Sequence, residues 1–249
     1  MIMGNFGDRM KVYENSYRIN LPKRMPVILR IDGTHFHTYT RGMSKPFDED
    51  LVNAFWETCT YLAENIMGCK VVYHQSDEIS LLLTNYDKLT TQSWFDNNLQ
   101  KLVSVSASMA TAKFNEVMRK KYPDKQLATF DSRAWVIPHD EVCNYFLWRQ
   151  QDATKNSISM VAQANFSHKE LQGLNGKQMQ DKLMLEKGVN WNDTPIWQKR
   201  GVCVVKKYYD KNGSLRSKWE VDHETPIFSQ DREYIEKYVY LKEVKELQI

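Results

Sequence analysis

Long apolar runs are missing from this 249-residue chain, since none approaches the roughly 20 residues that a membrane-spanning helix needs. Residues 1–11 also lack the apolar stretch of a secretory signal. Hydrophobic residues make up 42% and charged residues 26% of the chain, which is the ordinary balance of a globular protein. We therefore expect a cytoplasmic protein with no membrane partner, built as one sizeable domain or as a core with an extension.

Closely spaced metal-binding side chains are also missing. A structural zinc site needs soft ligands a few residues apart, and the cysteines form no CxxC pair. We expect them to be small apolar residues in a reducing compartment. The cysteines are Cys59, Cys69, Cys143 and Cys203.

A strong charge of one sign is missing too, because the net charge is only +3. Basic residues nevertheless cluster, and such clusters can neutralise RNA phosphates, although they more often form a solvated face. The clusters that we consider for RNA binding are Lys199 with Arg200 and Lys206 with Lys207.

The first half of the chain has the pattern of alternating strands and helices. A β-branched apolar run that ends at Gly33 predicts a buried strand, and a helical repeat of apolar residues begins after Asp48. Two strands around a polar turn, a long helix and a fourth strand follow. The expected order is β-α-β-β-α-β, a ferredoxin-like α/β (α+β) fold. The expected ranges are 26–32, 46–68, 71–74, 78–83, 94–121 and 127–137.

The second half is predicted to be mostly helical, with a late β-hairpin around Asn212 and Gly213. We expect residues 1–138 to form a catalytic domain and residues 139–249 to form an extension packed on that core. The expected helices of the extension are 140–166, 169–187 and 232–241, and the hairpin strands are 202–209 and 217–221.

Three acidic residues should meet at one edge of this sheet. In a ferredoxin-like sheet the first and third strands are antiparallel neighbours, so Asp32 at the end of the first should lie beside Asp77 and Glu78 at the start of the third. Packed carboxylates repel unless a proton or cation intervenes, and Mg²⁺ prefers oxygen ligands. Two such ions can activate a hydroxyl and stabilise a leaving pyrophosphate. Gly33, without a Cβ, would let its carbonyl approach the metal.

The residues by themselves leave simpler interpretations open. Asp-Gly and Ser-Asp are common turn dipeptides, so Asp32 and Asp77 can each be only turn residues. Lys45 precedes the first helix, whose N-terminus favours anions, so it can hold a triphosphate or be a solvated loop lysine.

Five segments in the same order resemble the motifs of the tRNA-His guanylyltransferase family, in its bacterial and archaeal guanylyltransferase-like branch. RIDGTHFH at residues 30–37 resembles RIDGxxFH, KPFD at 45–48 resembles KPxD, and SDE at 76–78 is the same. FDSR at 130–133 resembles FDGR, and YFLWRQ at 145–150 resembles YLxWRQ. The resemblance covers most of the chain.

The resemblance implies a polymerase-type palm that extends tRNA in the 3′-5′ direction. ATP or GTP first activates a 5′-monophosphate of the tRNA, and the 3′-hydroxyl of an incoming nucleoside triphosphate then attacks the activated phosphate. It implies two Mg²⁺ ions on Asp32, Asp77 and the Gly33 carbonyl, with Glu78 among the catalytic residues. It also implies a homotetramer whose subunits share one tRNA.

The resemblance further implies residues that contact nucleotides and RNA. Lys45 matches a lysine that contacts the triphosphate, and Arg133 lies in a matched motif as a candidate RNA contact. The full set of nucleotide-binding residues expected is Arg30, His37, Lys45, Ser76, Lys101 and Asn156.

The chain departs from the family pattern at two places. Residues 154–160 replace a HINNLYN segment and keep only Asn156, and Asn97 and Asn98 replace paired arginines, although Lys101 remains. Both departures favour templated repair of 5′-truncated tRNA over dedicated addition of a guanylate to tRNA-His, which is the alternative.

Two other classes of protein share parts of this pattern. RNA-recognition modules have the same strand order, but they need exposed aromatic residues on the third strand, and EISLLL at residues 78–83 has none. Nucleotide cyclases and forward-direction polymerases use paired carboxylates too, but the FDSR and YFLWRQ segments argue against them.

Overall fold

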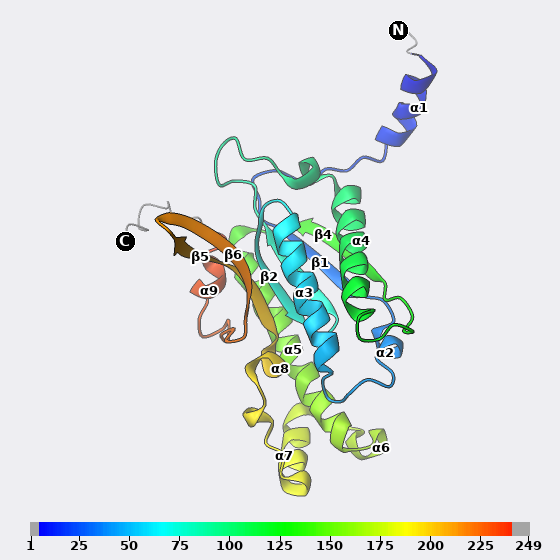
Figure 1. Cartoon of the computed structure of the whole chain (residues 1–249), viewed down its shortest axis with the longest axis vertical. Coiled ribbons are helices and arrows are strands. Elements are labelled where there is room, and N and C mark those ends of the chain that lie inside the picture. Colours follow the sequence, from blue (N-terminus) through cyan, green and yellow to red (C-terminus); the bar gives the residue numbers. More distant parts are fainter. Residues whose placement is uncertain (1–4, 241–249) are drawn as a thin grey trace.

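The computed structural model describes residues 5–240 of the chain. Six strands form one antiparallel sheet in the order β4-β1-β3-β2-β5-β6 (Figure 1). The strands are β1 (Val27–Gly33), β2 (Cys69–Gln75), β3 (Glu78–Leu83), β4 (Phe130–Val136), β5 (Val202–Lys211) and β6 (Ser214–Asp222). The longer helices are α1 (Phe6–Asn15), α3 (Glu49–Asn65), α4 (Leu99–Met118), α5 (Val142–Asn165) and α7 (Gly176–Lys187). The short ones are α2 (Phe36–Tyr39), α6 (His168–Leu171), α8 (Ile196–Arg200) and α9 (Glu233–Glu236).

The β-α-β-β-α-β order is confirmed, as β1-α3-β2-β3-α4-β4. The predicted hairpin is also present, and its two strands extend the sheet of the first half of the chain. Strand β5 pairs with β2, with Val71 opposite Val205 and His74 opposite Val202, so the sheet continues into the second half of the chain. The hairpin turn places Asn212 at φ 57° and Gly213 at φ 76°, as the tight turns that match strand twist require.

Two hydrophobic cores lie on the two faces of the sheet. On β1, Leu29 and Ile31 pack against α3 and α4, where Phe55 and Phe114 are buried. The neighbouring Ile28 points to the opposite face and packs against α5. This alternation follows from the two-residue period of a strand, and it is why β1 reads as a continuous apolar run.

Several predicted boundaries are wrong for local reasons. The helix expected from residue 94 begins at Leu99, because Phe95, Asp96 and Asn97 have positive φ and the Asn98 side chain caps the helix. The helix expected over 169–187 is broken between α6 and α7 at residues 172–175. Strand β4 and helices α3, α5 and α9 are shorter than predicted, whereas strands β2, β5 and β6 are longer. Residue 241 of the last expected helix lies outside the described residues.

Helix α1 was not predicted, and it extends away from the rest of the molecule (Figure 1). It begins at its cap Asn5 and buries none of its residues against the rest of the chain. Across residues 5–240, no helix combines the length and apolarity needed to cross a bilayer.

Gly201 lies at the junction of α8 and β5 and generates a stability prediction. It has φ 73°, and a Cβ there would meet the backbone oxygen of His74 at 2.4 Å. Gly201→Ala should therefore lower the free energy of unfolding by about 3 kcal/mol, measured by urea denaturation. Gly173→Ala is the matched control, because φ is 81° with open space around it, and it should cost only about 1 kcal/mol. Equal costs at both sites would contradict the close contact.

Candidate active site

The pairing of β1 with β3 brings the predicted acidic residues to one end of the sheet. Asp32 is directly opposite Glu78 in the register, and the Gly33 amide donates a hydrogen bond to the Asp77 carbonyl oxygen at 3.0 Å. Ser76 has φ 53°, so the chain reverses sharply just before Asp77. The expectation that these two strand ends meet is confirmed.

Asp32 lies close enough to Asp77 to affect its ionisation. Burial raises the pKa of Asp77, and the negative charge of Asp32 raises it further. The pKa of Asp32 is also raised, chiefly by burial and then by Asp131, while nearby arginines oppose the rise. The Ser76 hydroxyl donates to Asp77 Oδ1 at 3.1 Å. Two neighbouring half-buried carboxylates, both with raised pKa values, are a suitable place for a divalent cation.

The third acid, Glu78, forms an ion pair with Arg149 that the sequence did not predict. Its Oε1 accepts hydrogen bonds from Arg149 Nε at 2.8 Å and from the Ser80 hydroxyl at 3.3 Å. The Glu78 and Arg149 side chains are each only 8% exposed, and Arg149 also pairs with Asp152. Glu78 is thus neutralised by a residue of α5, in a buried ion pair that is costly to break.

The pairing with Arg149 sets Glu78 apart from the two aspartates. Among residues 5–240, no group of three or more His, Cys, Asp and Glu side chains is arranged to hold a metal ion. The expected convergence of Asp32, Asp77 and Glu78 at one edge of the sheet is confirmed, whereas metal binding by Asp32, Asp77 and the Gly33 carbonyl stays a prediction. Two aspartates remain, beside the backbone of Gly33.

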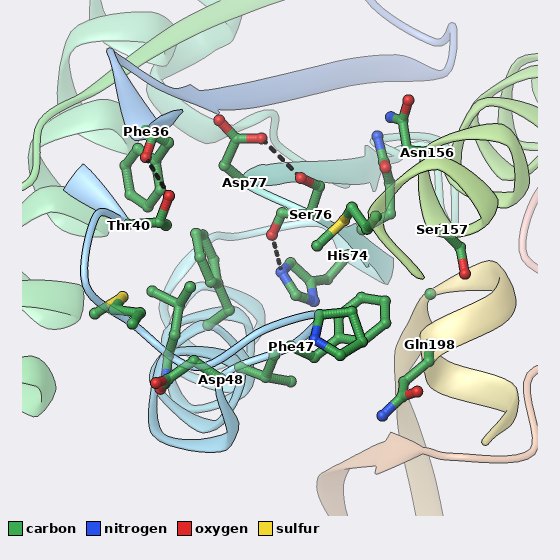
Figure 2. Close-up of a pocket in the computed structure, with 18 of the residues that line it drawn as sticks. Phe36, Thr40, Phe47, Asp48, His74, Ser76, Asp77, Asn156, Ser157 and Gln198 are labelled. Atoms are coloured by element: carbon green, nitrogen blue, oxygen red, sulfur yellow. Dashed lines mark hydrogen bonds between the residues drawn. The ribbon is translucent and has the colours of Figure 1, made fainter. Parts of the chain in front are cut away.

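A cavity of about 650 Å³ opens next to the Ser76–Asp77 turn (Figure 2). Its lining combines polar side chains with an aromatic cluster, in which Trp197 contacts Phe47 and Trp56. The cavity brings together six of the predicted site residues, which are Gly33, His37, Lys45, Ser76, Asp77 and Asn156, whereas Asp32 lies beside it and does not line it. Polar groups next to an aromatic cluster suit a nucleotide.

Arg30 does not line this cavity and lies on the face of the sheet that α5 covers. It is opposite Ser80 on β3 and Arg133 on β4. Its Nε is buried and has no hydrogen-bond partner within the described part of the chain. Arg30 lowers the pKa values of Asp32 and Glu78 by its charge, although burial outweighs it in both.

Lys101 does not line this cavity, and its expected contact with a nucleotide stays a prediction. It lies in the first turn of α4, with its ammonium 5.6 Å from the centre of the Phe95 ring. That end of α4 is tied to the segment before β1, since the Leu99 amide bonds to the Ile19 carbonyl. The other end of α4 is the one near the end of β1, because Phe114 packs against Phe130, which is opposite Gly33 in the register.

The predicted RNA-binding residues do not form one patch. Arg133 is on β4 and the Lys206–Lys207 pair is on β5, which are near opposite edges of the sheet. Lys199 and Arg200 end α8, where the Lys199 ammonium donates to the Asn192 carbonyl at 2.6 Å.

Several residues of the site were missed by sequence reasoning. His74 and Gln75 are buried and line the cavity, and the oxygen of the Gln75 carboxamide has no partner within residues 5–240. Arg149, in the YFLWRQ segment, was not among the expected site residues, yet it holds Glu78. The only available signal was that His74 and Gln75 directly precede the Ser76–Asp77 turn.

The raised pKa of Asp77 generates a prediction about stability. A carboxyl whose pKa is raised by folding takes up protons more readily when folded, so the metal-free protein loses stability as the pH rises through that pKa. Asp77→Asn should therefore stabilise the metal-free protein by about 1 kcal/mol at pH 7. The difference should shrink as the pH falls through the raised pKa.

Urea denaturation in the presence of a chelator checks this prediction, with the exposed Asp124→Asn as the control that should change little. A metal-free Asp77→Asn protein that is less stable than the parent at pH 7 would contradict the repulsion between the two aspartates.

Comparison with known proteins agrees with this site. A family model described as tRNAHis guanylyltransferase matches residues 7–138, slightly more than half of the chain. A bacterial tRNA(His) guanylyltransferase (Thg1)-like protein solved in complex with ATP is 74% identical, covers 96% of this chain and 100% of its own, and has a TM-score of 0.89. One in complex with GTP is 68% identical, with the same coverage and a TM-score of 0.83.

A curated relative, the tRNA(His) guanylyltransferase of Eremothecium gossypii, is 30% identical over 204 residues, which are 73% of this chain and 82% of the relative. The chain belongs to the tRNA(His) guanylyltransferase family, in its Thg1-like branch, and is a nucleotidyltransferase.

Proposed function

We propose that this enzyme adds nucleotides to the 5′ end of tRNA in the 3′-5′ direction, and that it repairs 5′-truncated tRNA by templated addition. ATP or GTP activates the 5′-phosphate, and nucleoside triphosphates supply the added residues. The observation that carries the proposal is the meeting of Asp32 with Asp77, because Asp77 lines a cavity large enough for a nucleotide. The ATP and GTP complexes of the bacterial relatives support nucleotide binding here.

The donor set fits Mg²⁺. Asp32 and Asp77 supply carboxylate oxygens, the carbonyl of Gly33 lies in the same turn region, and the substrate triphosphate and water would complete the ligands. When bound, two Mg²⁺ ions would increase the nucleophilicity of the attacking hydroxyl and stabilise the leaving pyrophosphate. The repulsion between the two aspartates in the metal-free protein is the physical reason for cation binding.

The chain's own residues would then orient the nucleotide. Lys45 and Ser76 line the cavity, where an ammonium and a hydroxyl can contact phosphate oxygens, and His37 and Asn156 line it too. Glu78 acts through structure in this proposal, because its ion pair with Arg149 fixes β3 against α5 directly beside Asp32.

The rival interpretation as an RNA-recognition module is not supported. All six residues of β3 are buried, so this strand offers no face on which bases can stack. Asn97 and Asn98, which replace the expected arginines, have structural roles. The Asn97 amide donates to the carbonyl oxygens before β1, and Asn98 caps α4. This observation favours repair over dedicated guanylate addition.

We also propose that the enzyme acts in the cytoplasm as a homotetramer. Helix α1 supports subunit contacts, because it presents Phe6, Val12 and Tyr13 to solvent.

The enzymatic test uses a 5′-monophosphorylated tRNA that lacks its first nucleotide. We expect Mg²⁺, ATP and the four nucleoside triphosphates to give growth at the labelled 5′ end, with the nucleotide that pairs with the opposite strand. Asp32→Ala should reduce this rate by roughly a thousandfold with the fold intact, because it removes a shared metal ligand. Asp124→Ala is the control and should retain the parent rate.

The outcomes separate the candidate functions. Addition of guanylate to tRNA-His alone, regardless of template, would favour the dedicated guanylyltransferase. Growth at the 3′ end, a cyclic nucleotide product, or an Asp32→Ala enzyme with near-normal rate would contradict the proposal.

The hairpin offers a face for the tRNA. Residues opposite each other in an antiparallel pair share a face, and this puts Lys207 with Lys218 and Tyr209 with Arg216 on one side. Lys206 is on the other side, where its ammonium lies 5.0 Å from the centre of the Trp219 ring. We propose that the first side, which we name the basic hairpin face and which also carries Lys211, contacts RNA phosphates.

Replacing Lys211 and Arg216 together by alanine should weaken tRNA binding at least tenfold at low salt. It should also make the dependence of log Kd on log salt shallower by roughly two. Filter binding at several salt concentrations measures both, and ATP affinity should not change. Lys206→Ala is the matched control from the opposite side. An equal loss of tRNA affinity in the control would contradict the assignment to one face.

A further inference from the structure

His74 lies between the Ser76–Asp77 turn and Phe47 in the wall of the cavity (Figure 2). It is the next-to-last residue of β2, it is only 5% exposed, and it lines the cavity. Its ring stacks on Phe55 with a centroid distance of 4.7 Å and an interplanar angle of 24°. The ring orientation is therefore fixed by packing, and the two ring nitrogens have defined directions.

One of these nitrogens is committed to the turn that carries Asp77. His74 Nε2 lies 2.9 Å from the Ser76 carbonyl oxygen, and a carbonyl oxygen can only accept. Nε2 therefore carries the proton and donates. Burial lowers the pKa of His74 to about 4, so the ring is neutral at neutral pH. The other nitrogen, Nδ1, then has no proton and can only accept a hydrogen bond.

Nδ1 has no hydrogen bond to any residue within the part of the chain that the structure describes. In Figure 2 the bonded nitrogen points to Ser76, and the other nitrogen is on the side of the ring away from it, toward Phe47. Triphosphate oxygens are acceptors at neutral pH and cannot bind an unprotonated nitrogen. The N–H group of a base can do so, and the aromatic cluster of Phe47, Trp56 and Trp197 in the cavity lining suits a base.

We propose that Nδ1 of His74 accepts a hydrogen bond from a base N–H of the bound nucleoside triphosphate, while Nε2 of the same ring holds the Ser76–Asp77 turn. The inference rests on the proposed function, because it assumes that the cavity binds a nucleotide. His74 is then a substrate-binding residue at one nitrogen and a positioning residue at the other. One side chain thereby couples the base to the turn that presents the Asp77 carboxylate.

The analogue purine riboside 5′-triphosphate isolates this hydrogen bond, because its base carries no N–H group while its ribose and triphosphate are those of ATP. Titration calorimetry with Mg²⁺ should show that the parent enzyme binds ATP roughly tenfold tighter than the analogue. This comparison needs no substitution, so it does not depend on the folding of a variant.

The same titrations with the variant His74→Gln provide a second test. The glutamine amide nitrogen reaches the place of Nε2 and can still donate to the Ser76 carbonyl, but no acceptor remains at the place of Nδ1. We expect the tenfold preference for ATP to disappear, with ATP binding about as weakly as the analogue. Inorganic triphosphate with Mg²⁺ is the control ligand and should bind equally to both proteins, and urea denaturation reports whether the variant is folded.

The results distinguish this inference from the function on which it rests. If the parent binds ATP and the analogue equally, or if His74→Gln keeps the preference for ATP, His74 does not recognise the base and the inference is wrong. If inorganic triphosphate binding falls as much as ATP binding in His74→Gln, the residue only supports the turn, and the inference is again wrong. A parent enzyme that binds no ATP would overturn the proposed function itself.

Discussion

The antiparallel register of β1 with β3 is the constraint on which the site depends. It sets Asp32 opposite Glu78, and the hydrogen bond from the Gly33 amide to the Asp77 carbonyl fixes the turn beside it. Without this register the two aspartates would not face the same end of the sheet. A shift by one residue would move the Asp32 side chain to the other face. The buried apolar residues of β1, which pack on both faces, hold the register in place.

Charge is distributed unevenly around this register, and the distribution has a functional consequence. Glu78 is paired with Arg149 in a buried ion pair, whereas burial raises the pKa values of Asp32 and Asp77 and the charge of Asp32 raises that of Asp77 further. The charged forms of Asp32 and Asp77 are therefore disfavoured where a metal ion could bind, whereas the charge of Glu78 is balanced by Arg149. Stability is lower in the metal-free state for the same reason that the site can bind cations.

The sequence predicts the part of the site that follows from local pattern and strand order. The strand that ends at Gly33, the turn before Asp77 and their meeting all follow from the β-α-β-β-α-β order. The partner of Glu78 does not, because Arg149 lies on α5, which is remote in sequence and is brought to β3 only by tertiary packing. Which end of α4 lies near the cavity does not follow from the order of residues either, and Lys101 is in the first turn of α4, outside the cavity lining.

Local backbone conformations limited the prediction in a similar way. The positive φ values at Phe95 to Asn97 delay the start of α4, and no residue in that segment is a glycine that would signal them. The double role of His74 depends on its stack against Phe55 and on the direction of one carbonyl group. Neither can be read from the order of residues, although the adjacent Ser76–Asp77 turn was recognised.

The most direct measurement is the anomalous diffraction of Mn²⁺ in a crystal of the enzyme with ATP, because Mn²⁺ accepts the same oxygen ligands as Mg²⁺. The account predicts manganese density in contact with the carboxylates of both Asp32 and Asp77, with the ATP triphosphate extending from it into the cavity. Manganese bound to the triphosphate alone, with both carboxylates uncoordinated, would contradict the central claim.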